Sequence, residues 1–259
     1  MTALFEDLIF GPIRSRRLGI SLGVNLLPQH AKICNFDCIY CECGSNTERK
    51  GEPQERRFSN RDDVRTALRQ TLINMRNQGE LPDVITFAGN GEPTLHPEFE
   101  QIIEETIQTR NEIAPEAKIS VLSNATTLAR ESVVRALKRV DNPILKIDSA
   151  IESVAQIINR SAPNYSVERV IDQLSSLKGE CIVQSMFLRG TVDGVTFDNT
   201  TENEVSNWLE AIEKIAPRQV MIYSLDRDTP CQGLQKIERE ELQKIAQRVE
   251  LLGIRCPVA

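Results

Sequence analysis

Three cysteines in one short segment constrain this chain more than any other feature. Residues 34 to 41 read Cys-Asn-Phe-Asp-Cys-Ile-Tyr-Cys, so Cys34, Cys38 and Cys41 follow the spacing Cys-x3-Cys-x2-Cys, with Tyr40 before the third. Thiolates are soft ligands that suit iron–sulfur clusters, zinc or copper(I). A structural zinc site closes with four ligands, and an electron-transfer [4Fe–4S] cluster takes four cysteines. Three thiols would instead leave one iron open for a substrate or cofactor.

A closed zinc site is the alternative for this segment. It would need Cys43 or a histidine as its fourth ligand. Cys43 lies two residues beyond Cys41, which is closer than the usual spacing of paired zinc ligands. The two histidines, His30 and His96, are single residues without ligand spacing. The spacing therefore favours an iron–sulfur cluster with an open iron.

Length and composition describe a globular protein. The chain has 259 residues, which is ordinary for a single α/β barrel, and 40% hydrophobic with 26% charged residues allows a sizeable core. It shows neither a signal-peptide pattern nor an apolar run long enough to span a membrane. Without a secretion signal, the seven cysteines are expected to be ligands and free thiols, so we expect no membrane association and a cytoplasmic location. Four of them, Cys43, Cys181, Cys231 and Cys256, have no assigned role.

The net charge of −6 argues against broad non-specific binding to nucleic acid. Basic residues nevertheless flank the three cysteines on both sides. They are Arg14, Arg16, Arg17, Arg49, Lys50, Arg56, Arg57 and Arg61. A solvated surface and a grip on an anionic substrate are both open interpretations of these residues.

Short apolar runs alternate with helical patterns along most of the chain. Strands are expected over residues 21–27, 84–88, 119–122, 144–147, 182–188 and 220–224, and helices over 60–77, 98–109, 128–139, 154–159, 166–178, 203–215 and 238–252. The alternation predicts six parallel βα units in one α/β domain over residues 1–259, with residues 1–19 as an N-terminal arm. A partial barrel and a doubly wound sheet share this order of elements. In both, functional residues lie at the carboxyl ends of the strands.

A second motif, Ala-Gly-Asn-Gly-Glu-Pro-Thr-Leu-His-Pro, covers residues 88–97 directly after the second expected strand. Gly89 and Gly91 permit positive φ and close approach of another backbone. Glu92 supplies a carboxylate, and Pro93 fixes the turn. A plain glycine–proline turn would explain the motif by itself. Its place downstream of the three cysteines points to a binding site instead.

Later strand ends also carry polar residues. Lys146 and Asp148 share one face of the fourth strand, because side chains alternate along a strand. Facing the interior together, they would be costly unless paired or bound to a ligand, so a mutual salt bridge and a catalytic role are both open. Gln184 and Met186 share a face of the fifth strand and could contact a cofactor or pack.

The pattern Cys-x3-Cys-x-aromatic-Cys resembles the motif of the radical S-adenosylmethionine (SAM) superfamily. The resemblance implies a partial (β/α)6 TIM-like barrel whose iron–sulfur loop follows the first strand. It also implies a [4Fe–4S] cluster held by Cys34, Cys38 and Cys41, with SAM chelated at the open iron. In that family the reduced cluster cleaves SAM to methionine and a 5′-deoxyadenosyl radical, which abstracts a hydrogen atom from the substrate, while the protein positions and shields the cofactors.

Residue roles follow from the same resemblance. Asn90-Gly91-Glu92 matches the Gly-Gly-Glu type motif that binds the SAM ammonium group, with Asn in place of the first Gly. The residues expected to bind SAM are Tyr40, Gly89, Asn90, Gly91, Glu92, Pro93, Ser123, Asn124, Asp148, Gln184, Met186 and Arg189. The residues expected at the substrate or in catalysis are Lys146, Asp148, Arg160, Tyr223, Asp226 and Arg227. Surface ion pairs are the alternative for the residues that follow the strands.

A narrower resemblance extends over nearly the whole chain. The segments FGPIRSRRLGISLGVNLL, CNFDCIYC, FAGNGEPTLHPEF, IINR, VQSMFLRG and IYSLDRDTP resemble a group of small radical SAM proteins related to the wybutosine-type tRNA-modifying enzymes. Membership of that group implies no particular substrate. An RNA base, a protein glycine, as in glycyl-radical-enzyme activating enzymes, and a small molecule or peptide are the three expected classes. An external reductant such as flavodoxin or ferredoxin is expected as a partner.

A protein of another class is the remaining alternative. An Fe–S or zinc sensor, or another metal-dependent binding protein, could carry the same three cysteines. The Gly-Asn-Gly-Glu motif argues against this interpretation, because a sensor does not need a pocket for SAM.

Overall fold

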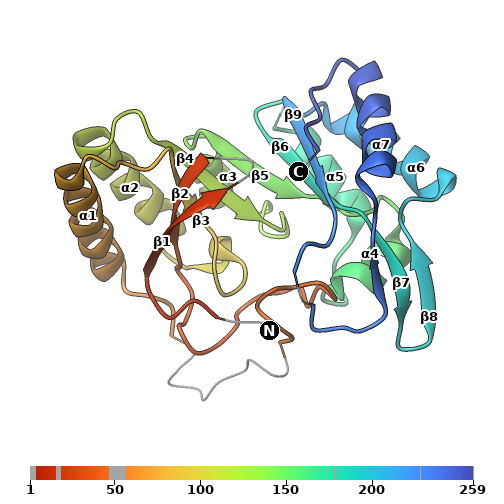
Figure 1. The fold of residues 1–259 in the computed structure, drawn as a ribbon, viewed down its shortest axis with the longest axis horizontal. Helices are drawn as coiled ribbons and strands as arrows, with labels where there is room; N and C mark the ends of the chain where they lie inside the picture. Colours follow the sequence, from red (N-terminus) through yellow and green to blue (C-terminus); the bar gives the residue numbers. More distant parts are fainter. Residues whose placement is uncertain (1–3, 16–18, 47–56, 178, 228, 259) are drawn as a thin grey trace.

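A seven-stranded sheet forms the centre of the computed structural model, which describes residues 4–15, 19–46, 57–177, 179–227 and 229–258 (Figure 1). Its strands are β1 (Ile9–Ser15), β2 (Gly19–Val24), β3 (Val84–Phe87), β4 (Lys118–Ser123), β5 (Asn142–Lys146), β6 (Ile182–Met186) and β9 (Gln219–Tyr223). They lie in the order β1-β2-β3-β4-β5-β6-β9. A smaller sheet has the order β10-β7-β8. Its strands are β7 (Leu188–Val192), β8 (Val195–Asp198) and β10 (Leu234–Lys236).

The order of the strands decides between the two predicted architectures. From β2 to β9 each strand runs parallel to the next, with Val24 opposite Phe87 and Phe87 opposite Val121. A doubly wound sheet would reverse its order at a switch point, whereas this sheet is wound in one direction only. The partial barrel of six parallel strands is therefore confirmed. The N–H groups of Val220 and Ile222 on β9 donate to the carbonyls of Arg255 and Pro257, so a C-terminal segment lies along that strand.

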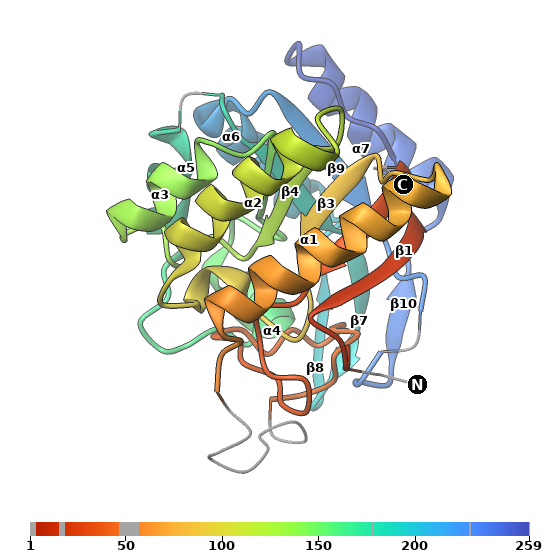
Figure 2. The ribbon, with the colours of Figure 1, turned by 90° about the vertical axis from the view of Figure 1, so that its left-hand side faces the viewer.

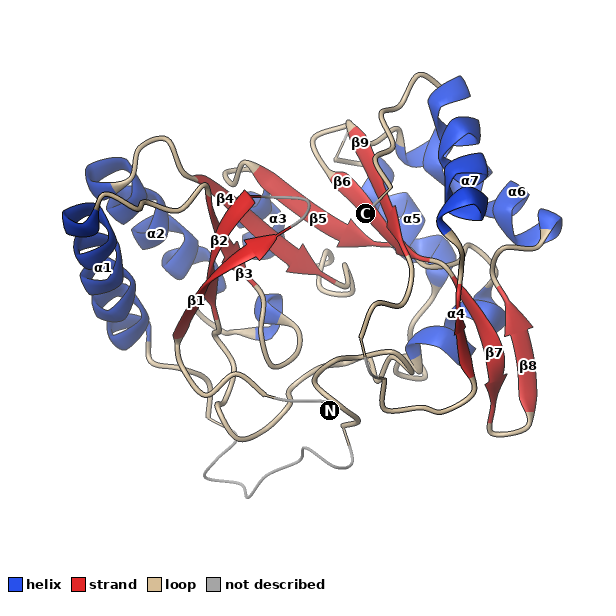
Figure 3. Ribbon diagram, viewed as in Figure 1, coloured by secondary structure: helices blue, strands red, loops and turns tan. Residues whose placement is uncertain are grey.

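Helices cover the outer face of the main sheet. They are α1 (Arg61–Gln78), α2 (Phe99–Ile113), α3 (Glu131–Leu137), α4 (Glu152–Asn159), α5 (Val167–Ser175), α6 (Glu202–Ile215) and α7 (Arg239–Leu251). Figure 2 shows α1, α2 and α3 side by side across one half of the molecule. In Figure 3, α1 and α2 lie to the left of the main sheet and α5, α6 and α7 to its right. Strands β7 and β8 of the small sheet lie at the lower right. Within the described residues, no helix combines the length and apolar character that crossing a bilayer requires.

Helix α1 illustrates how the sequence sets an element. The Asn60 side chain accepts hydrogen bonds from the N–H groups of Asp62 and Asp63, which caps the first turn. The helix then buries one stripe of apolar side chains, and Gly79 with φ +75° ends it. The buried residues are Val64, Leu68, Leu72 and Met75, which recur at helical spacing.

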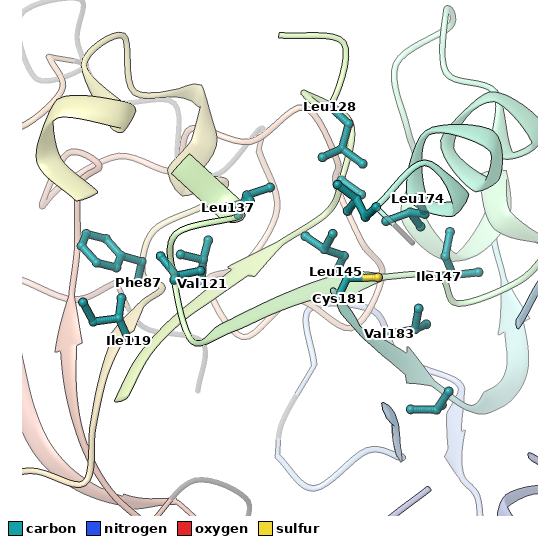
Figure 4. Close-up of a cluster of buried hydrophobic side chains, with 14 of the residues drawn as sticks. Phe87, Ile119, Val121, Leu128, Leu137, Leu145, Ile147, Leu174, Cys181 and Val183 are labelled. Atoms are coloured by element: carbon teal, nitrogen blue, oxygen red, sulfur yellow. The ribbon is translucent and has the colours of Figure 1, made fainter. Parts of the chain in front are cut away.

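The main core lies between the sheet and its helices. Alternate residues of each strand point into it, among them Phe87, Val121, Leu145 and Val183 (Figure 4). The intervening residues face the inside of the partial barrel. Ile144, Ile182 and Met221 form a small apolar cluster there. Polar pairs lie on the same inner face, where Ser21 Oγ and Thr86 Oγ1 are 2.8 Å apart and Asn142 Nδ2 donates to Ser120 Oγ at 3.0 Å.

The fold differs from the prediction at β1 and in the small sheet, whose strand β10 was also not expected. The expected N-terminal arm contains β1, which pairs antiparallel with β2 and carries a register shift between Phe10 and Ile13. Gly11 and Pro12 interrupt its apolar pattern, and proline is tolerated at such an edge or bulge. The second difference is the β7–β8 hairpin, whose turn is Asp193-Gly194 with φ +52° and +78°. Asp-Gly is a recognised signal for this type of turn, so the hairpin was predictable but missed.

Candidate active site

The segment with three cysteines lies where the backbone after β2 meets the motif after β3. The Ile33 N–H donates to the Asn90 carbonyl at 2.9 Å, and the Glu92 N–H donates to the Ile33 carbonyl at 3.0 Å. Gly91 stands between these bonds with φ +137°, and a Cβ there would lie 1.9 Å from the Ile33 oxygen. The two sequence motifs are therefore one structural unit, and the glycine is required by close approach of the cysteine loop.

The cysteine loop, defined as residues 32–46, also reaches the other half of the barrel. Its Asp37 and Ile39 N–H groups donate to the carbonyls of Asn159 and Ile158 at the end of α4. Figure 1 shows this orange loop crossing below the sheet toward α4. The loop therefore contacts segments that follow β2, β3 and β5, which places the thiols at the carboxyl ends of the strands.

The three predicted ligand thiols differ in their surroundings. Asn124 Nδ2 lies 3.7 Å from Cys34 Sγ, and Asn159 Nδ2 lies 3.7 Å from Cys38 Sγ. Burial raises the pKa of Cys38 to about 11. Hydrogen bonds from Cys43 and the nearby Lys32 cation lower the pKa of the Cys41 thiol.

Three thiols gathered in one loop suit an iron–sulfur cluster. Over the ranges that the structure describes, no three His, Cys, Asp or Glu side chains surround a point where one metal ion could sit. Cys43 donates to the Gly89 carbonyl at 3.2 Å, so this thiol is directed toward the glycine motif. Thiolates that bind separate irons of a cluster need no common centre at single-ion distances.

A buried network joins Tyr40 to residues at the carboxyl ends of β5 and β6. The Tyr40 hydroxyl donates to Asp148 Oδ2 at 2.5 Å, and Lys146 Nζ donates to the same hydroxyl. Lys146 Nζ lies 3.5 Å from Asp148 Oδ2 and 3.8 Å from Cys38 Sγ. Lys146 and Asp148 therefore do share a face, and their salt bridge exists, but Tyr40 and the Cys38 thiol belong to the same network.

Asp148 is the centre of this network. Besides Tyr40, it accepts from Asn159 Nδ2 at 2.7 Å and from the Met186 N–H at 2.9 Å. Its side chain has no exposed surface. Burial alone would lower the pKa of Lys146, but Asp148 and the Cys38 thiol raise it well above its usual value. The network therefore holds a cation and a carboxylate beside the cysteine loop.

The predicted SAM motif is built into the fold by its side chains. Glu92 accepts from the Thr94 hydroxyl at 2.6 Å and from the Asn124 N–H at 2.7 Å, and burial raises its pKa. The Asn90 side chain donates to the Pro28 carbonyl at 2.8 Å and bonds both backbone groups of Phe5. Pro93 begins a short 3-10 helix that ends at Leu95.

Ser123 and Asn124 lie at the end of β4, next to the cysteine loop. Asn124 Nδ2 donates to Asn35 Oδ1 at 2.7 Å, and Ser123 Oγ accepts from the Ala125 N–H at 3.1 Å. Gln184 stands beside Lys146 in the sheet register. Met186 packs in the apolar cluster that includes Cys38 and Tyr40. All four residues therefore lie around the network and the loop.

Several other predicted residues form ion pairs. Arg189 is paired with Asp198 and Glu241, as the alternative interpretation expected. Arg160 and Asp226 are held in the same way by Asp193 and Lys236. Arg227 differs, because its partner at 2.6 Å is Glu42, which follows Cys41. Tyr223 packs against the cluster of Phe36, Cys38, Ile39 and Tyr40.

Sequence reasoning missed several residues that shape the site. Lys32 is the least expected of them: its side chain is 1% exposed, and its ammonium group bonds Gly44 and Asp37. Burial alone would lower the pKa of Lys32, but the neighbouring Cys41 and Cys34 thiols and Asp37 raise it. The other missed residues are Asn46, Asn159 and Asn199. A lone lysine two positions before the first cysteine was the available signal for Lys32.

The predicted basic flanks receive a mixed result. Arg16, Arg17, Arg49, Lys50 and Arg56 lie outside the described residues. Arg61 pairs with Glu98 at 3.0 Å and Glu105 at 3.4 Å. Arg14 and Arg57 are exposed. An anion grip from these residues stays a prediction.

Comparisons with known proteins identify the relatives of this chain. The family model described as Radical SAM superfamily matches residues 29–198. A UPF0026 protein of Helicobacter pylori strain J99 is 30% identical over 255 residues, covering 96% of this chain and 76% of that protein. A Brachyspira hyodysenteriae protein named GTPase Obg is 26% identical over 240 residues, 91% of this chain. The chain spans only 32% of that protein's length.

Solved structures share the fold. A radical SAM methyltransferase from Sphaerobacter thermophilus superposes with a TM-score of 0.66 at 14% identity, covering 92% of this chain and 65% of that one. Archaeal TYW1 is one neighbour among several, with a TM-score of 0.55 at 12% identity, covering 89% of this chain and 71% of that one. At these identities the likeness extends to the fold and not to the substrate.

Proposed function

This chain belongs to the radical SAM superfamily, and we propose that it cleaves SAM reductively and directs the resulting radical to a substrate bound at the open side of the partial barrel. The family implies a [4Fe–4S] cluster and SAM as cofactors. The observation that carries the proposal is the bridge between Ile33 and Gly91, which joins three cysteines and a glycine motif into one unit. A closed metal site would not need that second element.

The three thiols and the glycine motif have different tasks in this proposal. Cys34, Cys38 and Cys41 would hold the cluster, which when bound supplies the electron that breaks a carbon–sulfur bond of SAM. The backbone carbonyl of Gly91 is suited to an ammonium group, because carbonyl oxygens accept hydrogen bonds. The buried Glu92 carboxylate braces this backbone through Thr94 and Asn124.

The Tyr40 network would orient the other side of the site. Lys146 lies over the Tyr40 ring at 4.6 Å from its centroid. Asp148 accepts hydrogen bonds from the Tyr40 hydroxyl and the Asn159 amide, which orients both side chains beside Cys38. Gln184, Met186 and Tyr223 line the same side and are proposed to contact SAM or substrate. Asp226 and Arg227 are proposed at the substrate entrance, where Arg227 already contacts the cysteine loop through Glu42.

The substrate is proposed more narrowly as an RNA base. The support is the narrow resemblance to proteins related to wybutosine-type enzymes, together with arginines that flank the loop. The net charge of −6 points the other way. Binding of tRNA should therefore be confined to the site and weaken with rising salt, because phosphate contacts release counterions. Cleavage by oxygen of a partner glycyl-radical protein after co-incubation would favour the activating-enzyme alternative instead.

The deciding experiment is anaerobic reconstitution with iron and sulfide, followed by EPR of the reduced protein with and without SAM. We expect a [4Fe–4S] signal that changes when SAM is added. A triple variant with Ser at positions 34, 38 and 41 is the matched control and should take up no cluster. Tight zinc binding without iron uptake, or a signal indifferent to SAM, would contradict the proposal and favour the sensor alternative.

A further inference from the structure

A buried cation lies inside the cysteine loop. Lys32 Nζ donates to the Gly44 carbonyl at 2.7 Å and to Asp37 Oδ1 at 3.2 Å. The side chain is 1% exposed, whereas that of Asp37 is 20% exposed. The residues between Lys32 and Gly44 include all three proposed cluster ligands. The lysine therefore closes the loop that carries them.

The ends of this loop are fixed by further bonds. Ile33 is tied to the glycine motif through the Asn90 and Glu92 backbone. At the other end, the Asn46 N–H donates to Asp37 Oδ1 at 2.7 Å, and Asn46 Nδ2 donates to the carbonyls of Cys34 and Phe36. Lys32 and Asp37 thus stand as an ion pair at the centre of a loop closed on both sides. These hydrogen bonds hold the Lys32 ammonium group in a fixed position.

We propose that Lys32 is a positioning residue that holds the cysteine loop closed and whose fixed positive charge favours the reduced state of the cluster. This inference rests on the proposed function. Each electron added to a thiolate-bound cluster adds negative charge, and nearby charges and solvent exposure are known determinants of cluster potential. Water screens charges weakly at a buried position, so a cation there acts more strongly than one at the surface.

The charge of Asp37 gives the proposal a second, opposite prediction. Asp37 partly neutralises Lys32, and Asp37→Asn removes the negative charge while keeping an Oδ1 acceptor for the Asn46 N–H. Both Lys32→Met and Asp37→Asn weaken the same loop. If the effect is electrostatic, they shift the reduction potential in opposite directions. If the pair only stabilises the loop, both variants should behave alike.

The test is a redox titration of the reconstituted protein, monitored by EPR in the absence of SAM. We expect Lys32→Met to lower the ratio of reduced to oxidised cluster about tenfold at a fixed potential, which corresponds to about 59 mV for a one-electron couple. Lys32→Arg should retain most of the parent potential, and Asp37→Asn should raise the ratio. Lys214→Met is the control, because Lys214 is 53% exposed and pairs with Asp172 on the outer helices; its potential should equal that of the parent.

The role of Lys32 in holding the cysteine loop closed is tested separately, in the protein without cluster. Lys32→Met should lower the midpoint of thermal unfolding, and Lys32→Arg should recover part of the loss. An unchanged potential in Lys32→Met at full iron content would overturn the proposal, and so would shifts of the same sign in Lys32→Met and Asp37→Asn. If Lys32→Met assembles no cluster, Asp37→Asn still decides the sign of the shift. A parent protein that takes up no iron and sulfide contradicts the proposed function itself, which separates the two failures.

Discussion

Position 91 has no room for a side chain. A Cβ on Gly91 would lie 1.9 Å from the Ile33 carbonyl oxygen, and φ is +137°. Gly91→Ala must therefore separate the glycine motif from the cysteine loop, and it should lower the free energy of unfolding by roughly 3 kcal/mol. Urea unfolding of the protein without cluster measures this loss, and iron uptake on reconstitution should fall with it.

Gly79→Ala is the matched control for this substitution. Gly79 also has a positive φ, +75°, but no atom lies within 4 Å of the position of its Cβ. Only the left-handed backbone should be penalised there, at about 1 kcal/mol. Equal losses at both positions would show that the contact with Ile33 is less close than the structure indicates.

Asp148 illustrates the cost of removing one charge from a buried network. Its carboxylate accepts from Tyr40, Asn159 and the Met186 N–H, and it faces the Lys146 cation. Asp148→Asn removes the carboxylate that pairs with the Lys146 cation. It also places an amide N–H₂ group beside groups that themselves donate hydrogen bonds. We expect a loss of about 3–5 kcal/mol in urea unfolding.

The control for Asp148→Asn is Glu100→Gln, which removes a carboxylate from an exposed pair with Arg135. Exposed pairs contribute little because water screens them, so this variant should unfold close to the parent. A parent-like Asp148→Asn would mean that Lys146 loses its charge or reaches water without cost. Lys146 would then be better suited to contact the substrate than to stabilise the fold.

At the scale of elements, periodicity was sufficient for the helices and the parallel strands. The helical pattern over residues 60–77 predicted α1, which spans Arg61–Gln78, because this signal is local. β1 and the β7–β8 hairpin were not predicted. Their pairing depends on partners along the sheet, and Gly11 and Pro12 hide the pattern of β1. The singly wound order was also beyond periodicity, since it is a property of the assembled sheet.

For the site, local motifs were the predictable part. The cysteine loop and glycine motif were recognised from residues close in sequence, and the structure joins them at Ile33 and Gly91. Partners distant in sequence were not predictable. Tyr40 meets Asp148, and Lys32 closes its loop on Gly44, only after folding. Arg189 lies in ion pairs with Asp198 and Glu241, and its contact with SAM stays a prediction.

Asn199 connects the two sheets and allows a test at this scale. It is 1% exposed, and its Nδ2 donates to the carbonyls of Asp148 and Met186 at 2.8 Å. Its Oδ1 accepts from the Leu188 N–H at 2.8 Å. Asn199→Leu would leave these three backbone groups buried without partners, so we expect a loss of about 3 kcal/mol or more in urea unfolding.

Asn207→Leu is the comparison for Asn199→Leu. Asn207 lies exposed on α6 and donates only to Asn203 one turn earlier, so its loss should be slight. Because Asn199 bonds Asp148, its variant should also reduce cluster uptake. Full stability and uptake in Asn199→Leu would show that the small sheet is held by its apolar contacts alone.

At the scale of the whole molecule, the two ends of the barrel have different roles. The carboxyl ends of the strands carry the cysteine loop, the glycine motif and the Tyr40 network. The opposite end carries Asp141, whose Oδ2 accepts from the Ile119 N–H at 2.9 Å and from Arg110 at 3.1 Å. Arg218 bonds the Asp141 carbonyl. Asp141 therefore joins α2, β4 and β9 at the end away from the proposed chemistry.

This separation predicts a dependence of stability on pH that is independent of cofactor binding. Burial alone would raise the pKa of Asp141, but the Ile119 N–H, Arg110 and Lys118 hold it below its usual value. A carboxylate with a lowered pKa in the folded state stabilises the fold above the unfolded-state pKa and loses that contribution as pH falls through the lowered value. The free energy of unfolding without cluster should thus decrease from about pH 6 to about pH 3 less steeply in Asp141→Asn than in the parent. Parallel curves for the two proteins would show that Asp141 is no more stabilised in the folded chain than in the unfolded one.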